Sequence, residues 1–387
     1  MPWTETHTMQ RHRFILACQS GEYSISHLCR EFGISRKTAY KWLQRFDPRA
    51  LSSLDDRSHA CHTQPNRTPD HVADALLAVK QERPHWGPAV IRRYLLNLNP
   101  AWTVPAASTI GNILRQHGLV RPAATRRKSP VRQVPLRDVS DVNQTWGADF
   151  KGKFLLSGGG DRWCHAFTLT DLHSRQLLCC EAGAAETGAF VRACLEQAFR
   201  ENGLPEVIRT DNGNPFAGTG LGGLTPLSVW LIKLGILPER IRPGKPTENG
   251  RHERMHRTLK EAMSYGHRYG TLEEQQAWFN AFREVYNTVR PHSAVGGAVP
   301  SSLWRKSERE YTGEVPEVAY DEGAKLYRVQ QKGDIRLKGR RLFVSESLRG
   351  EWIEIREEDE GGTSILFGRK ILGYYEAVSH SIRRYEG

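Results

Sequence analysis

The 387-residue sequence lacks the features that mark secreted, zinc-ribbon and membrane proteins. It has seven cysteines, an odd number, and no C-x-x-C pair, which argues against a disulfide framework and against a zinc ribbon. No stretch reaches the roughly 18 apolar residues of a membrane span, and the amino-terminal residues do not form a signal peptide. We therefore expect a cytoplasmic protein that does not enter a membrane.

One group of metal-ligating side chains remains, namely His59, Cys61, His62 and His71. A zinc site here would need all four ligands to converge at tetrahedral distances. A polar linker is the simpler interpretation, and we adopt it.

Acidic residues are absent from the stretch between Arg121 and Arg137, which holds three prolines and the cations Arg126, Arg127 and Lys128. Such a segment does not favour a packed core, so we expect a domain linker that follows DNA phosphates. The whole chain is also basic, with 55 Lys and Arg against 43 Asp and Glu, a net charge of +12 and a pI near 9.5. This balance indicates a polyanionic partner.

Residues 11–46 have the pattern of three short helices. Gly33 can supply the tight turn before the third helix, and Ser35 can cap that helix by accepting backbone N–H bonds. This order resembles a helix-turn-helix, whose recognition helix enters the major groove of DNA. We expect the cations of the third helix to contact DNA, namely Arg36, Lys37, Lys41 and Arg45. We expect its other face to pack inward through Ala39, Tyr40 and Leu43. The alternative is an ordinary three-helix unit with a solvated basic face.

A second helical unit follows, with helices over 69–82 and 89–98 and a third that Ser108 caps and Gly118 ends. We interpret it as a winged-helix-like DNA-binding module. The alternative is a linker subdomain that only packs.

From residue 144 the pattern changes to alternating strands and helices, which is typical of a mixed α/β sheet covered on both faces. We expect strands over 146–154, 163–170, 177–182, 207–210 and 239–242, and helices over 187–201, 226–234, 249–264 and 272–286. Five short strands then follow near the carboxyl end and indicate a small all-β barrel. The predicted domains are 1–60 (helix-turn-helix), 61–120 (second helical module), 121–143 (basic linker), 144–305 (α/β core) and 320–387 (barrel).

Three carboxylates occupy distinctive settings within the α/β core: Asp149 in a strand, Asp211 just after another, and Glu253 on a helix. If the two strands are neighbours, both aspartates lie at one edge of the sheet, since adjacent strands are about 4.8 Å apart. Mg²⁺ binds through a few carboxylates plus substrate phosphates, and two such ions can clamp a phosphoryl displacement. Arg257 and Lys260 lie one and two turns beyond Glu253 and could hold phosphate.

These segments resemble the catalytic core of insertion-sequence transposases of the DDE type and of retroviral-type integrases. The resemblance covers about 144–300 and includes the motifs at 171–175, 209–216, 242–250 and 286–292. It implies a ribonuclease H-like fold, with Asp149, Asp211 and Glu253 as catalytic residues and ligands of two Mg²⁺ ions, which Mn²⁺ can replace. Further candidates for DNA contact lie close to Glu253 in the sequence: Lys245, Arg251, His252 and His256.

Other residues of these motifs have less specific roles. We expect Asp171 and Arg175 to shape the sheet edge, Trp146 to lie in the core and Glu248 to belong to a loop. The motif that ends the last core helix, with Tyr286, Asn287, Arg290 and His292, has a structural role at least as readily as a catalytic one.

The implied function is a DNA transposase that binds element ends, hydrolyses a phosphodiester to free a 3′-hydroxyl, and joins that hydroxyl to target DNA. Its partners are DNA and, because two ends must be brought together, further copies of the chain in a homo-oligomer. Two alternatives remain: a DNA-binding regulator whose core is a catalytically inactive relic, and a ribonuclease H-like nuclease that cuts without joining.

Overall fold

The computed structural model describes residues 6–57, 67–120, 138–158, 162–218, 220–242, 249–266, 269–358, 362–376 and 381–384. The chain forms two compact units, Met1–Arg67 and Thr68–Gly387. Among the helices of these ranges, none combines the length and the apolar character that crossing a membrane requires. The polar linker expected around His59, Cys61 and His62 lies outside the described residues.

The first unit contains three α-helices and a 3-10 turn: α1 (His7–Gln19), α2 (Ile25–Glu31), α3 (Arg36–Arg45) and η1 (Leu51–Leu54). Ser35 caps α3, because its side chain accepts a hydrogen bond from the backbone N–H of Thr38 at 3.1 Å. Gly33 has a φ of +64°, which is the left-handed conformation that the turn before α3 requires. The expected turn and cap are therefore confirmed.

The core of this unit corrects one expectation about α3. Ala39 is fully buried as expected, but Tyr40 is 52% exposed, and Trp42 is buried in the core instead. Trp42 lies three residues after Ala39, whereas Tyr40 lies on a different face of the helix. The buried core also contains Phe14, Ile15, Leu28, Cys29 and Leu54.

The second unit begins with three helices, α4 (Asp70–Glu82), α5 (Pro88–Leu98) and α6 (Ala107–Gln116). They enclose their own core, which includes Leu76, Trp86, Ile91 and Ile110. The expectation that Ser108 caps the third helix is wrong, because α6 has Ala106 as its N-cap and no capping side chain.

This helical module contacts the chain just beyond α10 (Leu272–Thr288). Arg93 donates to the carbonyl of Gly296 at 2.5 Å, and Asn97 donates to the carbonyl of Gly297 at 3.1 Å. Val285 and Val289 pack against the core of the module. Polar and apolar contacts together hold the module against this part of the unit.

A five-stranded sheet with the order β3-β2-β1-β4-β5 forms the centre of the unit. The first three strands are antiparallel neighbours, whereas β4 and β5 run parallel to β1. The strands are β1 (Thr145–Leu155), β2 (Trp163–Asp171), β3 (Leu177–Gly183), β4 (Val207–Thr210) and β5 (Leu237–Arg240). The predicted strands are thus present, although β5 begins two residues earlier than expected.

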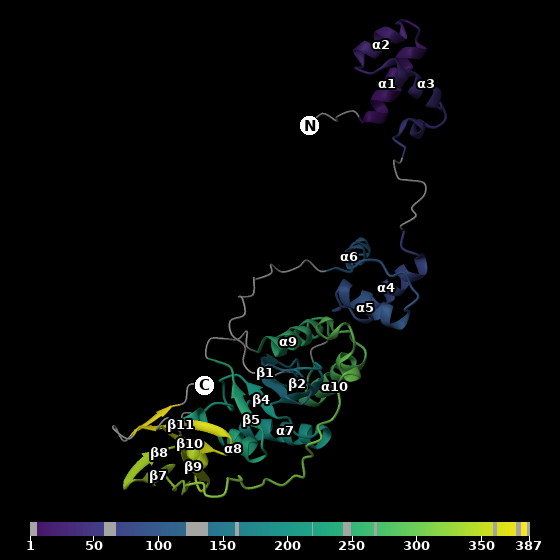
Figure 1. The fold of residues 1–387 in the computed structure, drawn as a ribbon. Helices are drawn as coiled ribbons and strands as arrows, with labels where there is room; N and C mark the ends of the chain where they lie inside the picture. Colours follow the sequence, from purple (N-terminus) through teal and green to yellow (C-terminus); the bar gives the residue numbers. More distant parts are fainter. Residues whose placement is uncertain are drawn as a thin grey trace. The chain divides into compact units, whose positions relative to one another are not determined.

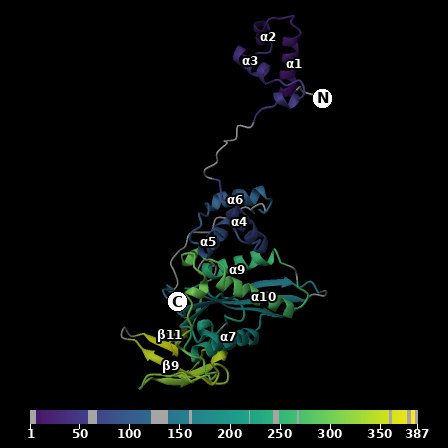
Figure 2. The same ribbon diagram turned by 90° about the vertical axis from the view of Figure 1, so that its right-hand side faces the viewer.

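Helices cover both faces of this sheet, as Figures 1 and 2 show. On one face lie α9 (Gly250–Met263) and α10, whose residues share a core with Cys164, Ala166 and Leu177. On the other face lie α7 (Gly188–Asn202) and α8 (Pro226–Lys233), which pack around Trp146 and Phe167. Because side chains alternate along a strand, Trp146 and Ala148 face α7 while Gly147 and Asp149 face α9.

At Gly147, β1 lies close to a side chain of α9. A Cβ atom at this position would lie 2.9 Å from Cδ2 of Leu172 and 3.0 Å from Nδ1 of His252. Only glycine leaves room for the His252 ring to lie against the strand. This clearance brings the face of α9 close to Asp149, two residues further along β1.

The strands near the carboxyl end do not form the expected closed barrel. Instead they form an open sheet with the order β12-β11-β10-β9-β6 and a separate hairpin of β7 and β8. β6 and β12 lie at opposite edges of the open sheet, and their described residues do not pair with each other. The strands are β6 (Leu326–Arg328), β7 (Asp334–Leu337), β8 (Arg340–Phe343), β9 (Trp352–Glu357), β10 (Thr363–Phe367), β11 (Lys370–Glu376) and β12 (Ser381–Arg384).

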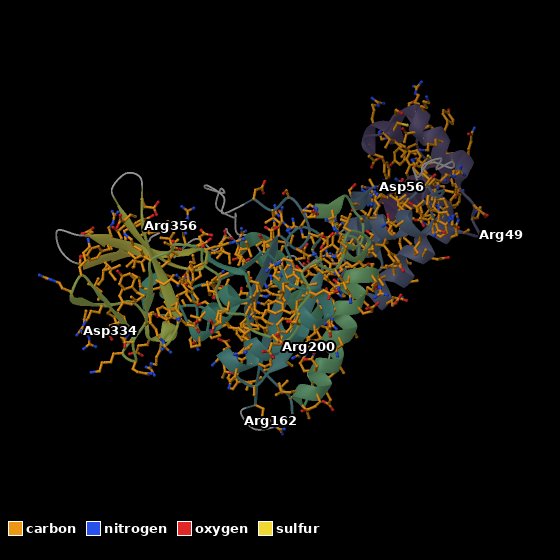
Figure 3. The ribbon with its side chains drawn as sticks, turned by 60° about the horizontal axis from the view of Figure 1, so that its bottom comes forward. Arg49, Asp56, Arg162, Arg200, Asp334 and Arg356 are labelled. Atoms are coloured by element: carbon orange, nitrogen blue, oxygen red, sulfur yellow. The ribbon has the colours of Figure 1, made fainter. Side chains whose placement is uncertain are left out.

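This sheet is joined to the α/β layer rather than separate from it. Its buried core includes Leu221, Leu224 and Ile232, which come from α8 and the loop before it. Lys233 of α8 also pairs with Glu351 at 2.9 Å. Figure 3 shows the side chains of the region, including Asp334, which pairs with Arg341 at 2.6 Å, and Arg356.

Candidate active site

The three sequence-predicted carboxylates come from β1, the end of β4 and α9. Gly147 of β1 pairs with Arg209 of β4 in parallel register, so extending the register by two residues places Asp211 beside Asp149. The backbone N–H of Gly213 donates to Oδ1 of Asp211 at 3.0 Å and orients that carboxylate. Glu253 lies in the first turn of α9, the helix that packs over this face of the sheet.

The negative charges of Asp211 and Glu253 both act on Asp149. Burial, followed by the negative charge of Asp211, raises the pKa of Asp149 to about 7, and Glu253 contributes in the same direction. Burial also raises the pKa of Glu253, while Arg257 lowers it. Asp149 and Asp211 are half-buried and Glu253 is exposed, and the charges around Asp149 carry an electrostatic cost that a divalent cation would offset. Since carboxylate oxygens are the ligands that Mg²⁺ prefers, the donor set fits this ion.

Two histidines of α9 lie against the same strands. His252 and His256 are one turn apart, and their rings are 4.6 Å apart between centroids. Ligand atoms of Asp149, His252 and His256 all lie within 4.8 Å of one another. Burial lowers the pKa of His256 to about 4 and the pKa of His252 well below its usual value, so both rings are neutral at pH 7.

His252 does not have the role expected from its position in the sequence. We expected it to contact DNA, but the side chain is fully buried and bonds to two threonines of β2. Local spacing could not reveal this, because Thr168 and Thr170 precede His252 by more than 80 residues.

The cations of α9 fall into two groups. Arg257 and Lys260 are exposed, as a role in holding phosphate requires. Arg251 donates to the carbonyl of Leu172 at 3.0 Å, so its guanidinium supports the turn after β2. Lys245 lies outside the described residues, as do Arg126, Arg127 and Lys128 of the basic linker.

The candidate DNA-binding cations of the first unit lie on α3. Arg36, Lys37 and Lys41 are exposed. Lys41 also lies over the Trp42 ring, with its Nζ atom 4.9 Å from the centroid. Arg45 lies over the same ring and donates to the backbone carbonyl of Asp55, which makes it a structural contact as well.

Two of the remaining motif residues, Asp171 and Asn287, make structural contacts. Asp171 is buried and accepts hydrogen bonds from the backbone of Asn143 at 2.8 Å and of Ser174 at 2.7 Å, which confirms its expected role at the sheet edge. Asn287 uses both atoms of its amide to bond the backbone of Leu177, at 2.8 and 2.9 Å. The motif at the end of α10 therefore ties that helix to β3.

Sequence reasoning missed two contributors to this site. Glu186 adds negative charge near Asp149 and bonds Nδ1 of His165 at 2.9 Å. Lys151 of β1 adds positive charge near His256. Both lie close in sequence to predicted elements, but no motif marks them.

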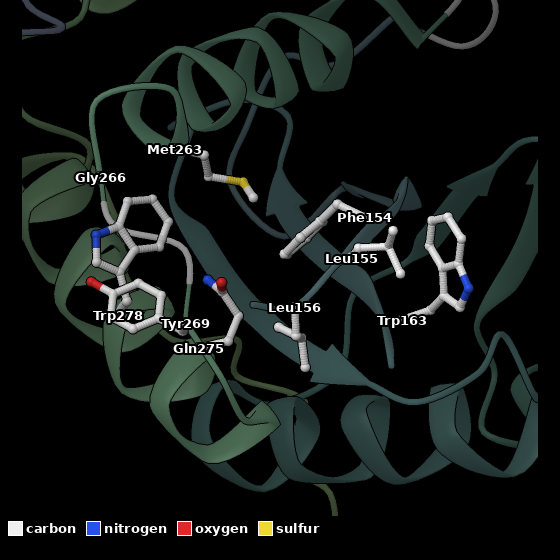
Figure 4. Close-up of a pocket in the computed structure, with 9 residues that line it drawn as sticks. All are labelled: Phe154, Leu155, Leu156, Trp163, Met263, Gly266, Tyr269, Gln275 and Trp278. Atoms are coloured by element: carbon white, nitrogen blue, oxygen red, sulfur yellow. The ribbon is translucent and has the colours of Figure 1, made fainter. Parts of the chain in front are cut away.

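A separate cavity of about 320 Å³ lies at the far end of β1, where Phe154 and Leu156 meet the end of α9 and the start of α10 (Figure 4). The described residues that line it are mainly aromatic and aliphatic, and none of them carries a carboxylate or an imidazole. The cavity is therefore distinct from the candidate active site.

The sequence of this chain matches models of known protein families. Two models described as "Integrase core domain" match residues 140–246 and 234–300. A "Helix-turn-helix domain" model matches residues 10–59, and a "Homeodomain-like domain" model matches residues 38–114.

Two relatives come from bacterial insertion elements. The "Insertion element IS407 uncharacterized 31.7 kDa protein" of Burkholderia multivorans is 27% identical over 243 residues, which is 62% of this chain and 83% of the relative. The "Insertion element IS476 uncharacterized 39.2 kDa protein" of Xanthomonas euvesicatoria is 28% identical over 183 residues, which is 47% of this chain and 48% of the relative.

Solved structures of viral integrases show a weaker likeness. The catalytic core domain of HTLV-2 integrase in complex with magnesium is 15% identical, with a TM-score of 0.33, over 42% of this chain and 97% of that one. A simian T-cell lymphotropic virus intasome chain is 16% identical, with a TM-score of 0.38, over 80% of this chain and 98% of that one. The family models and the insertion-element relatives together support an insertion-sequence transposase with an integrase-like core at residues 140–300.

Proposed function

We propose that this transposase cuts and joins DNA strands at the site formed by Asp149, Asp211 and Glu253. The observation that carries the proposal is the placement of three carboxylates from β1, the end of β4 and α9, in which the charges of Asp211 and Glu253 both act on Asp149. Acidic side chains that come from three separate elements and raise the pKa of one of their number are typical of a functional site.

The reaction has two steps in this proposal. Hydrolysis of a phosphodiester at the element end frees a 3′-hydroxyl, and that hydroxyl then attacks a phosphodiester of target DNA. Two bound Mg²⁺ ions, held by the three carboxylates, would supply the charge stabilisation that an in-line phosphoryl displacement needs. Mn²⁺ would serve in their place.

The chain's own residues bind and orient the DNA. Arg257 and Lys260 project from the same helix as Glu253 and would hold phosphates beside the reacting bond. Arg36, Lys37 and Lys41 of α3 would contact the element ends, in the manner of a recognition helix.

The reaction also implies an assembly. Two element ends must be joined in one event, so we propose that the active form is a dimer or a higher oligomer. We further propose that the chain is divided into the segments 1–60, 61–120, 121–143, 144–305 and 320–387. Limited proteolysis tests this division, because a protease should cleave first at the boundaries between these segments.

The test is a joining assay that uses labelled DNA ends from the flanks of the gene, a target plasmid and Mg²⁺. We expect joined product from the wild type and none from Glu253→Gln, which removes one carboxylate charge and retains the shape of the side chain. Glu261→Gln is the matched control, since Glu261 is an exposed residue of the same helix. Both variants should bind the DNA ends like the wild type.

The outcomes separate the candidate functions. Joining by Glu253→Gln at the wild-type rate would refute the assigned site. Binding by the wild type without cleavage or joining would favour the regulator with an inactive core. Metal-dependent cleavage without joining would favour a nuclease.

A further inference from the structure

The hydroxyl of Thr168 on β2 lies at the centre of a hydrogen-bond cluster. It bonds the backbone carbonyl of Asp149 at 3.0 Å, Nε2 of His252 at 2.9 Å and Nε2 of His256 at 2.7 Å. A carbonyl oxygen only accepts, whereas either imidazole can donate, so the single hydroxyl proton is assigned to Asp149, the choice that satisfies all three contacts at once. The Thr168 oxygen must then accept from both histidines, and each histidine carries its proton on Nε2.

This proton assignment excludes His252 as a metal ligand. Its Nε2–H is used by Thr168, and its Nδ1 accepts from the hydroxyl of Thr170 at 2.6 Å. Both ring nitrogens are therefore satisfied, and the ring is fully buried. His252 instead holds α9 against β1 and β2.

The same assignment leaves His256 with an unprotonated Nδ1 that is directed toward Asp149. This nitrogen lies 3.9 Å from Oδ2 of Asp149, which is beyond hydrogen-bond range. One cation bonded to both atoms at about 2.1 Å requires them to lie no more than about 4.2 Å apart. The observed separation of 3.9 Å satisfies that limit.

We propose that His256 supplies a nitrogen ligand, through Nδ1, to the divalent cation that Asp149 binds, and that Thr168 is the positioning residue that holds the ring in this tautomer. The inference rests on the proposed function and adds a ligand beyond the three carboxylates. A metal-ligating imidazole is commonly oriented in this way by a hydrogen bond at its other nitrogen. The presence of a nitrogen ligand would also favour Mn²⁺ over Mg²⁺ in binding strength.

The test uses Mn²⁺ bound to the full-length protein and does not depend on activity. Pulsed electron paramagnetic resonance detects the coupling of Mn²⁺ to a directly bound nitrogen, and ¹⁵N-histidine labelling assigns it. We expect this coupling in the wild type and its loss in His256→Gln, which retains a donor to Thr168 but removes Nδ1. His117→Gln, at an exposed position after α6, is the matched control and should retain the coupling.

Three further variants complete the test. Thr168→Val should weaken Mn²⁺ binding by about 10- to 100-fold, because it removes the acceptor that orients His256, whereas Thr168→Ser should bind almost like the wild type. His256→Asn places an oxygen near the former Nδ1 position and should bind Mn²⁺ without nitrogen coupling. It provides a second test if His256→Gln does not fold.

The possible failures are distinguishable. If the wild type binds Mn²⁺, if Asp149→Asn abolishes this binding, and if no nitrogen coupling appears, His256 is not a ligand and the carboxylate site stands. If no Mn²⁺ binding depends on Asp149, the proposed function fails and this inference fails with it.

Discussion

Substitution of Gly147 by alanine tests whether α9 is seated on β1 as the structure describes. The added Cβ would lie 2.9 Å from a Leu172 methyl group and 3.0 Å from Nδ1 of His252, whereas ordinary contacts between carbon atoms are about 3.5–4.0 Å. Leu172 or the helix must therefore move by several tenths of an ångström. Overpacking of this kind costs about 1–3 kcal/mol, and it displaces the helix that carries Glu253 and His256.

Denaturant unfolding and the joining assay together measure this effect. We expect Gly147→Ala to lower the free energy of unfolding by about 1–3 kcal/mol and to reduce joining more than DNA-end binding. Gly111→Ala is the control: Gly111 lies inside α6, its added Cβ would meet only Cγ of Pro88 at 3.7 Å, and the change should stabilise by about 0.5–1 kcal/mol. Wild-type stability and joining in Gly147→Ala would refute the close approach of α9.

Three other predictions concern charge and packing. Burial and the charge of Asp211 raise the pKa of Asp149 from 3.8 to about 7, so the folded, metal-free protein retains a proton that the unfolded chain releases. Ionisation of Asp149 therefore lowers the free energy of unfolding as the pH rises from about 4 to about 7. Asp149→Asn should stabilise the metal-free protein at pH 8 but not near pH 4. Urea unfolding at both pH values measures this difference, and equal effects at the two pH values would contradict the raised pKa. Lys260→Ala should weaken DNA binding for every sequence and reduce the slope of log K against log salt by about 0.9, as fluorescence anisotropy would show, and an unchanged slope would exclude a phosphate contact. Asn287→Ala should lower the free energy of unfolding by about 1–3 kcal/mol, because it leaves the buried N–H and carbonyl of Leu177 without their partners; a loss below 0.5 kcal/mol in chemical denaturation would show that other groups replace the amide.

Local features of the sequence predicted much of the architecture. The spacing of the apolar residues predicted the order of strands and helices in the α/β core. The turn at Gly33 and the cap at Ser35 predicted where α3 begins. Both kinds of signal act over a few residues, so a single sequence contains them. The settings of Asp149, Asp211 and Glu253 were also visible, because each of these acids lies within a short and distinctive motif.

Features that depend on pairing between distant segments were not predictable from the sequence. Whether Tyr40 or Trp42 faces the core depends on how α3 packs against α1. Whether the last strands close into a barrel depends on pairing between the edge strands β6 and β12, whose described residues do not pair. The bond between Thr168 and His256 joins residues 88 positions apart. Neither residue carries a local signal for that contact. The sequence by itself therefore determined which acids were candidates for the site. Only the packing of α9 on the sheet decided which side chains surround Asp149, because hydrogen bonds of this kind form only after distant elements have come together.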